Sequence, residues 1–209
     1  ILDASSTTGA GGTVNASGSS VIAKAGSTID ASGATAGGNV NFGGGYQGAD
    51  ETIANAQTAT VEAGATLKAN TVDGDAGQVV VWSDNETVFE GSAEASSANG
   101  AGGLVEVSSK ENLNLNSWDI DVSGATTNGE LLLDPTNIDI VSGSSTGIGS
   151  AVTFNNTLYA DDIESWLQNS GNLSILTANS GSENGDITFE TGVDIAWSAN
   201  SILTLTAIN

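Results

Sequence analysis

Cysteine, methionine, histidine and arginine are all missing from this 209-residue chain, and proline occurs once. Without cysteine the chain has no disulfides, thiolate metal sites or thiol nucleophiles, and without histidine it cannot form a Ser-His-Asp triad of its own. No apolar run approaches the roughly 20 residues that span a bilayer. Nor does a charged and then apolar leader open the chain, so we expect a processed or excised segment with no signal peptide and no membrane insertion.

Positive charge is also scarce, because three lysines (Lys24, Lys68 and Lys110) face 25 acidic residues, for a formal net charge of −22. Phosphate binding depends on clustered Lys and Arg, so nucleic acid is excluded as a partner. The acidic balance favours cations, yet neither an EF-hand loop nor a Gly-Gly-x-Gly-x-Asp repeat is present. We therefore expect diffuse counterion binding and no cofactor, with an irregular calcium site as the weaker alternative.

What the chain does have is a repeat. A glycine followed two residues later by an aliphatic residue opens a short apolar unit five times, at Gly12, Gly38, Gly77, Gly103 and Gly129. The glycines are separated by 26, 39, 26 and 26 residues, all multiples of 13. The aliphatic residues that keep this phase are Val14, Val40, Val79, Val105 and Leu131.

Two parallel ladders of apolar residues accompany the first. One runs through Leu2, Ile29, Leu67, Ala93 and Ile120, and the other through Val21, Val61 and Val88. Each period thus holds three short alternating segments separated by Gly, Ser, Asn or Asp, which is the pattern of strands. Stacked periods would bury a continuous core, so the sequence predicts an all-β, right-handed parallel β-helix with three-strand coils of about 26 residues.

Two other architectures deserve comparison. A disordered Gly/Ser/Asn-rich tract has a similar composition, but disorder does not maintain a phase. A β-sandwich or propeller needs strands of more regular length and hairpin turns, which this sequence does not offer. The β-helix is the better interpretation.

The repeat changes at two places. The 39-residue step carries 13 extra residues, so we expect regular coils over residues 1–135 with an outward loop near 43–57. Residues 136–209 are predicted to continue the β-helix with longer strands and one short helix near 161–170. Asp161 or Asp162 would cap that helix, Gly171 would end it, and Ile163, Trp166 and Leu167 share one face.

Neither end of the sequence carries a capping pattern. Open ends of a β-helix are strand edges that must be covered or paired. We therefore expect either a segment of a longer chain or a subunit that associates end to end.

Several units resemble filamentous-haemagglutinin-like exoproteins, the adhesins exported by two-partner secretion. The units lie at residues 37–48, 77–84, 102–110 and 130–138, with later ones around 163–167, 185–189 and 203–207. The resemblance spans nearly the whole chain and implies a β-helical shaft, an outer-membrane transporter as the export partner, and a role in adhesion, biofilm cohesion or cell contact. The Asn-Pro-Asn-Gly element of the family's secretion domain is missing from this sequence. We therefore expect the chain to be part of the shaft.

Catalysis is the weaker interpretation of the acidic residues. The pairs Asp73/Asp75, Asp119/Asp121 and Asp161/Asp162 could serve polysaccharide cleavage, which needs two carboxylates about 5 to 9 Å apart. All of them lie in turns or on the polar phase of strands, where carboxylates are usually solvated or cap the backbone. We expect no enzyme.

Three residues are candidates for a surface contact. If Val79 and Val81 point inward, Val80 and Trp82 point outward as an apolar pair that could meet a sugar ring, a partner or a neighbouring filament. A loop or the short helix could equally cover them. Tyr46, in the inserted loop, is the third candidate, whereas Trp118 and Trp197 keep the phase of core residues.

The sequence thus predicts a secreted, extracellular cell-surface shaft that acts in adhesion or biofilm-matrix contact. A self-assembling filament or sheath subunit is the alternative, and a polysaccharide-active β-helix enzyme comes third. Expected partners are the transporter, a polysaccharide or other cell-surface component, and other copies of the chain.

Overall fold

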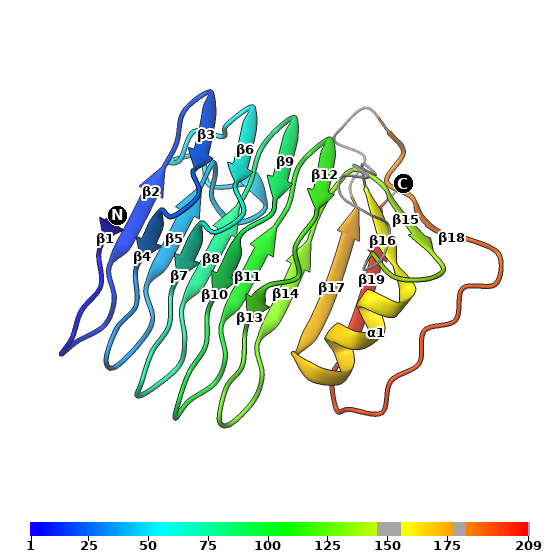
Figure 1. Cartoon of the computed structure of the whole chain (residues 1–209). Coiled ribbons are helices and arrows are strands. Elements are labelled where there is room, and N and C mark those ends of the chain that lie inside the picture. Colours follow the sequence, from blue (N-terminus) through cyan, green and yellow to red (C-terminus); the bar gives the residue numbers. More distant parts are fainter. Residues whose placement is uncertain (146–155, 178–182, 209) are drawn as a thin grey trace.

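The computed structural model describes residues 1–145, 156–177 and 183–208, and within them it consists of parallel sheets with one α-helix (Figure 1). The all-β prediction is confirmed at this level. The five-stranded sheet contains β1 (Leu2–Asp3), β4 (Thr28–Asp30), β7 (Thr66–Lys68), β10 (Ser92–Glu94) and β13 (Ile120–Asp121). The seven-stranded sheet contains β2 (Thr13–Ala16), β5 (Asn39–Phe42), β8 (Gln78–Val81), β11 (Leu104–Val107), β14 (Glu130–Leu133), β17 (Asn172–Thr177) and β19 (Leu203–Ala207).

Two smaller sheets complete the set. The four-stranded sheet contains β3 (Ser20–Ala23), β6 (Thr58–Val61), β9 (Glu86–Phe89) and β12 (Asn112–Leu115). The three-stranded sheet has the order β16 (Thr157–Tyr159), β15 (Ile138–Val141), β18 (Ile187–Phe189). From β1 to β12 the chain visits the five-, seven- and four-stranded sheets in the same order four times, so equivalent segments lie side by side (Figure 1).

The register of the seven-stranded sheet follows the repeat. Val14 pairs with Val40, Val40 with Val79, Val79 with Val105, and Val105 with Leu131. The prediction that these five residues form one column is therefore confirmed. In the five-stranded sheet the apolar residues that begin with Leu2 are likewise in register. Leu2 pairs with Ile29, and Ala93 pairs with Ile120.

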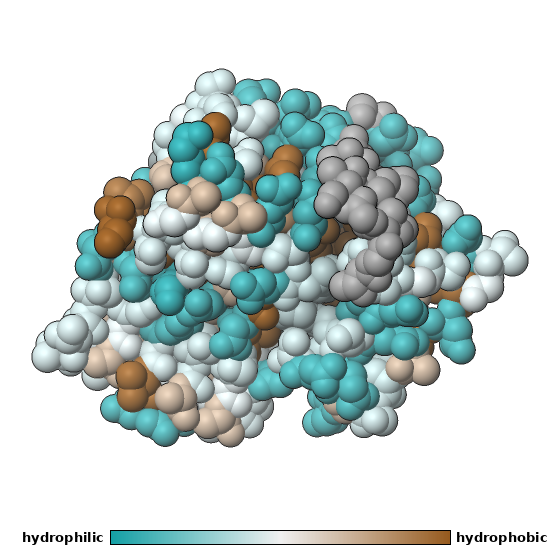
Figure 2. Space-filling view, in the orientation of Figure 1, coloured by the Kyte–Doolittle hydropathy of each residue, from teal (hydrophilic) through white to brown (hydrophobic). Residues whose placement is uncertain are grey.

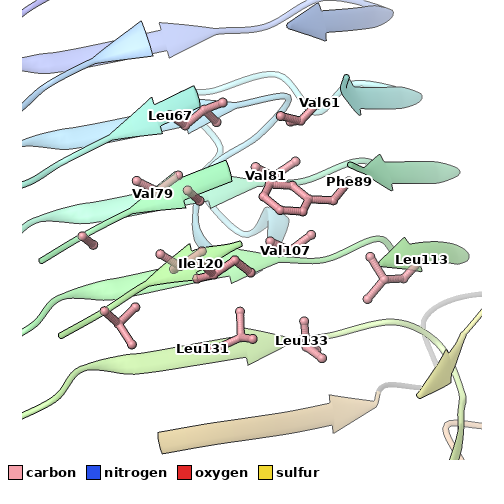
Figure 3. Close-up of a cluster of buried hydrophobic side chains, with 14 of the residues drawn as sticks. Val61, Leu67, Val79, Val81, Phe89, Val107, Leu113, Ile120, Leu131 and Leu133 are labelled. Atoms are coloured by element: carbon pink, nitrogen blue, oxygen red, sulfur yellow. The ribbon is translucent and has the colours of Figure 1, made fainter. Parts of the chain in front are cut away.

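The core lies between the sheets. Figure 3 shows Leu67, Val79, Val81, Phe89 and Leu131, drawn from several sheets, pointing into one apolar cluster, and all five have no exposed surface. Full burial of such a side chain stabilises a fold by about 1.5–3 kcal/mol. Because each strand contributes only two or three inward residues, the core depends on stacking neighbours and not on any single repeat.

After β14 the simple order ends. β15 does not continue the four-stranded sheet directly, because Asn156, just before β16, approaches β12 instead. The backbone N–H of Asn156 donates to the Leu113 carbonyl at 2.9 Å, and its side-chain Oδ1 accepts from the Leu113 N–H at 2.6 Å. Asn156 adopts φ 57°, a left-handed conformation that asparagine tolerates better than most residues.

The predicted helix is present as α1 (Ala160–Asn169), and Ile163, Trp166 and Leu167 are buried on one face as expected. Its cap differs from the prediction, since Tyr159 occupies the N-cap without a side-chain hydrogen bond. Asp161 and Asp162 lie in the first turn, where their charges favour the helix dipole. The Asp162 carboxylate does not cap the helix; it accepts hydrogen bonds from the Ser144 hydroxyl and the Ser145 N–H, each at 3.0 Å.

The tryptophans predicted to be core residues do pack against the core. Trp118 and Trp197 are both half-buried beside it. The Trp118 and Trp166 rings lie 6.0 Å apart at an angle of 46°, within the range of favourable aromatic pairs. Through this contact α1 lies against the segment that leads into β13.

Candidate functional site

The inserted loop, residues 43–57, lies against the outer face of the seven-stranded sheet. It leaves the sheet after β5 and contains one short 3-10 helix, η1 (Tyr46–Gly48). Its base is closed by the Ala56 N–H, which donates to the Gly43 carbonyl at 2.6 Å, while Ile53 and Ala56 are buried. The loop is therefore a packed cover, fixed at both ends by the strands it connects.

Val80 and Trp82 lie under this loop. Val80 has no exposed surface and Trp82 is 6 % exposed. The prediction that the two form an exposed apolar pair is therefore wrong. The loop covers both residues, which was one of the two alternatives to exposure. A Cβ added at Gly48 would lie 2.3 Å from the Trp82 ring, and Gly48 has φ +60°, so glycine permits both the turn and the close approach.

Tyr46 is the only one of the three candidates at the surface, with 45 % of its area exposed. Burial of the rest of the ring raises the pKa of Tyr46, and the nearby charges of Glu106, Glu130 and Asp134 raise it further. Tyr46 therefore stays a neutral phenol at ordinary pH and marks an acidic neighbourhood beneath the loop. Its role as a surface contact stays a prediction.

Glu106 is the most unusual residue beneath the loop. It points outward from β11 in register with Val80 and Leu132, yet it has no exposed surface. Burial raises the pKa of its carboxyl to about 8, against hydrogen bonds from the Gln47 N–H and from Ser108 that lower it. The Gln47 N–H lies 3.1 and 3.0 Å from the two carboxyl oxygens, so Glu106 connects the loop to the sheet.

Asp134 follows β14 on the same face. Burial raises the pKa of its carboxyl to about 6. Its backbone N–H donates to the Ser108 hydroxyl at 3.0 Å, which fixes the chain at this point. Glu106 and Asp134 are thus two carboxyl groups on adjacent strands whose ionised forms are both disfavoured by burial.

A groove with a volume of about 460 Å³ opens beside the loop. We call it the roofed groove. Its polar lining residues are Gln47, Asn55, Asp84, Lys110, Asp134, Thr136 and Thr177, and its apolar ones include Trp82, Pro135, Leu176 and Ile208. The volume lies within the range of small-molecule sites, and the mixed lining offers hydrogen-bond donors and acceptors next to apolar surface.

The acidic pairs that suggested catalysis do not line the roofed groove. Asp73 accepts from the Asn99 side chain at 2.8 Å, and Asp75 from the Ala101 N–H at 3.0 Å. Asp121 accepts from the Ser123 N–H at 2.9 Å. These carboxylates hold the turns of neighbouring repeats in place.

Glu106 is not among the predicted site residues, although its place in the sequence carries a signal. Glu106 stands between two aliphatic residues, Val80 and Leu132, in an outward column whose other members are polar. A charged residue among aliphatic neighbours indicates either exposure or a covered functional group. Lys110 and Asp134, which follow the ends of β11 and β14, carry no such signal.

Comparison with known proteins adds no family. No protein-family model and no curated protein matches the chain. Among the described residues no cluster of three Asp, Glu, His or Cys side chains is placed to hold a metal ion. In the same part of the chain, no helix has the length and apolar character needed to cross a membrane.

Proposed function

We propose that the chain is a segment of right-handed parallel β-helix that serves as the adhesive or matrix-forming shaft of a large secreted bacterial surface protein. The observation that carries the proposal is the continuous column of the seven-stranded sheet, which runs from Val14 to Leu203 without a break in pairing. A structure built by stacking grows in one direction and presents a long, repetitive side face. That geometry suits a shaft.

The surface supports the same role. The face in Figure 2 is mostly polar, with small and separate apolar patches, and the net charge of −22 keeps such a rod soluble. The resemblance to filamentous-haemagglutinin-like exoproteins adds export through an outer-membrane partner and a place on the cell surface. Contact with a polysaccharide or another cell then occurs along the side of the shaft.

Display on a non-adherent bacterium tests the adhesive role. Cells that present the chain should remain on a polysaccharide-coated or cell-coated surface under flow in larger numbers than cells that present Val105→Asp. That variant places a charge at a fully buried position, so it should be unfolded at equal expression. Equal retention of the two strains would count against the proposal.

Electron microscopy of the purified chain separates the shaft from the alternative filament. Isolated short rods support a shaft. Axial polymers of the chain alone would instead favour a self-assembling filament subunit.

A further inference from the structure

We propose that the roofed groove binds neutral hexose units of a polysaccharide. This inference rests on the proposed adhesive function and deepens it by naming a site and a ligand class. The groove gathers polar groups whose hydrogen-bonding capacity the described residues leave unused, beside apolar surface that can contact a sugar ring.

Asp84 and Asn55 are held in fixed orientations at the groove. The Asn55 amide Nδ2 donates to the Gly48 carbonyl at 3.0 Å and to Asp84 Oδ1 at 3.1 Å. The Trp82 indole N–H lies 3.4 Å from the same Asp84 oxygen. Both contacts fall on Oδ1, so Asp84 Oδ2 is left without a partner among the described residues. The Asn55 Oδ1 also has none, but it is buried beside Gly44 and is not open to a ligand. An unpartnered carboxylate oxygen at the wall of a groove can accept a hydrogen bond from a ligand.

Asp134 and Lys110 show the same lack of partners. The Asp134 carboxylate accepts no hydrogen bond from the described residues, although burial is enough to raise its pKa to about 6. Lys110 forms no ion pair with the described residues, and both side chains line the groove. The groove therefore offers two carboxyl groups, those of Asp84 and Asp134, and one strong donor, Lys110, whose hydrogen-bonding capacity the described residues leave partly or wholly unused.

A neutral sugar matches this set. Each sugar hydroxyl both donates and accepts, so neighbouring hydroxyls can donate to Asp84 and Asp134 while accepting from Lys110. Trp82, Pro135 and Leu176 supply apolar surface for the C–H faces of the ring. The net charge of −22 repels uronic acid polymers, and an ammonium group on an amino sugar would compete with Lys110 for the same two carboxyl groups.

Calorimetric titration of the whole chain with linear hexaoses of glucose, mannose and galactose tests the proposal. At least one neutral oligomer should bind, and Asp84→Asn should weaken that binding about tenfold or more. This substitution keeps an oxygen for the Asn55 contact. Asp119→Asn, at an exposed carboxylate outside the groove, is the matched control and should bind like the parent chain.

Two charged oligomers, a galacturonate and a glucosamine hexaose, complete the design. Binding of a charged oligomer alone, no binding of any neutral oligomer, or equal loss in Asp84→Asn and Asp119→Asn would each overturn the groove proposal. Unchanged circular dichroism of both variants excludes unfolding as the cause of a loss. If no sugar binds while displayed cells still adhere, the groove proposal fails and the proposed adhesive function stands.

Discussion

The regular repeats up to β14 and the part of the chain after it build the same sheet in different ways. Within the first part, paired residues of the seven-stranded sheet are 26 residues apart, or 39 where the loop intervenes. Beyond it, Leu131 pairs with Leu173 and Leu173 with Leu203, at spacings of 42 and 30 residues. The column continues although the period does not, so the fold requires matching inward residues and tolerates unequal connections.

The connections differ because the later part adds elements outside the column. β16 and α1 lie between β15 and β17 in the chain, and α1 precedes β17 as β10 and β13 precede β11 and β14. The helix thus takes the position in chain order that strands of the five-stranded sheet hold earlier. A helix can do so because Ile163, Trp166 and Leu167 supply the apolar face that a strand would otherwise provide.

Deletions within the regular part should have the largest effect, and they test whether the period determines the stacking. Removing residues 103–128, one complete repeat, joins β10 to β14 in the correct phase, and we expect a shorter chain that still unfolds cooperatively. Removing residues 103–115 takes away half a period together with β11 and β12, so the two-residue β13 would follow β10 where β11 belongs, and we expect loss of the folded state. Far-UV circular dichroism and urea unfolding measure both. Equal tolerance of the two deletions would show that the period does not determine the stacking.

The same substitution in each part compares their contributions to the core. Leu131 has no exposed surface, whereas Leu205 is 39 % exposed, and both belong to the seven-stranded sheet. Leu131→Ala should lower the free energy of unfolding by about 2–5 kcal/mol. Leu205→Ala should lower it by about 1 kcal/mol or less, because less apolar area leaves water there. Urea midpoints give the comparison, and a larger effect at Leu205 would contradict it.

The buried carboxyl of Glu106 beneath the loop should make the stability of the regular part depend on pH. The folded-state pKa of Glu106 is raised to about 8, so the folded chain keeps a proton that the unfolded chain has released. The stability associated with this proton is complete below the ordinary glutamate pKa near 4.5 and is lost as the pH rises to about 8.

We therefore expect the parent chain to lose stability between pH 6.5 and 8, by up to about 1.4 kcal/mol per pH unit. Glu106→Gln should lose less over the same interval, because an amide does not titrate. Asp134 adds a change in the same direction, but mainly below its pKa of about 6, outside the interval. Urea midpoints at several pH values measure the difference between the variants, and parallel profiles would show that Glu106 does not titrate there.

Much of the fold could be predicted from the sequence because the inward columns are periodic. The five residues from Val14 to Leu131 kept one phase, and that phase became the register. Strands were also predicted beyond residue 136, and two of those present, β17 with six residues and β19 with five, are longer than the strands of the regular part, as expected. The N-cap of α1 was not predicted, because Asp161 and Asp162 serve equally well in a first turn.

The site was harder to predict for a physical reason. An insertion has no period, so nothing in residues 43–57 indicates which face it covers or which outward residue it buries. The sequence could place Val80 and Trp82 on the outer face but could not decide between exposure and cover. The roofed groove depends on that cover and on contacts such as Gln47 to Glu106, 59 residues apart.

Alanine substitutions at two glycines test whether the loop covers Trp82, and we expect them to have the smallest effect. Gly48 in the loop and Gly192 in the later part both have positive φ, at +60° and +90°, but an added Cβ meets the Trp82 ring only at Gly48 and nothing within 4 Å at Gly192. Each alanine substitution should cost about 1 kcal/mol in backbone strain. Gly48→Ala should also displace the loop, because its methyl group would lie inside the contact distance of the indole. Tryptophan emission should then shift toward longer wavelength in Gly48→Ala and stay unchanged in Gly192→Ala. The same emission from both variants would mean that Trp82 keeps its environment without the close approach of Gly48.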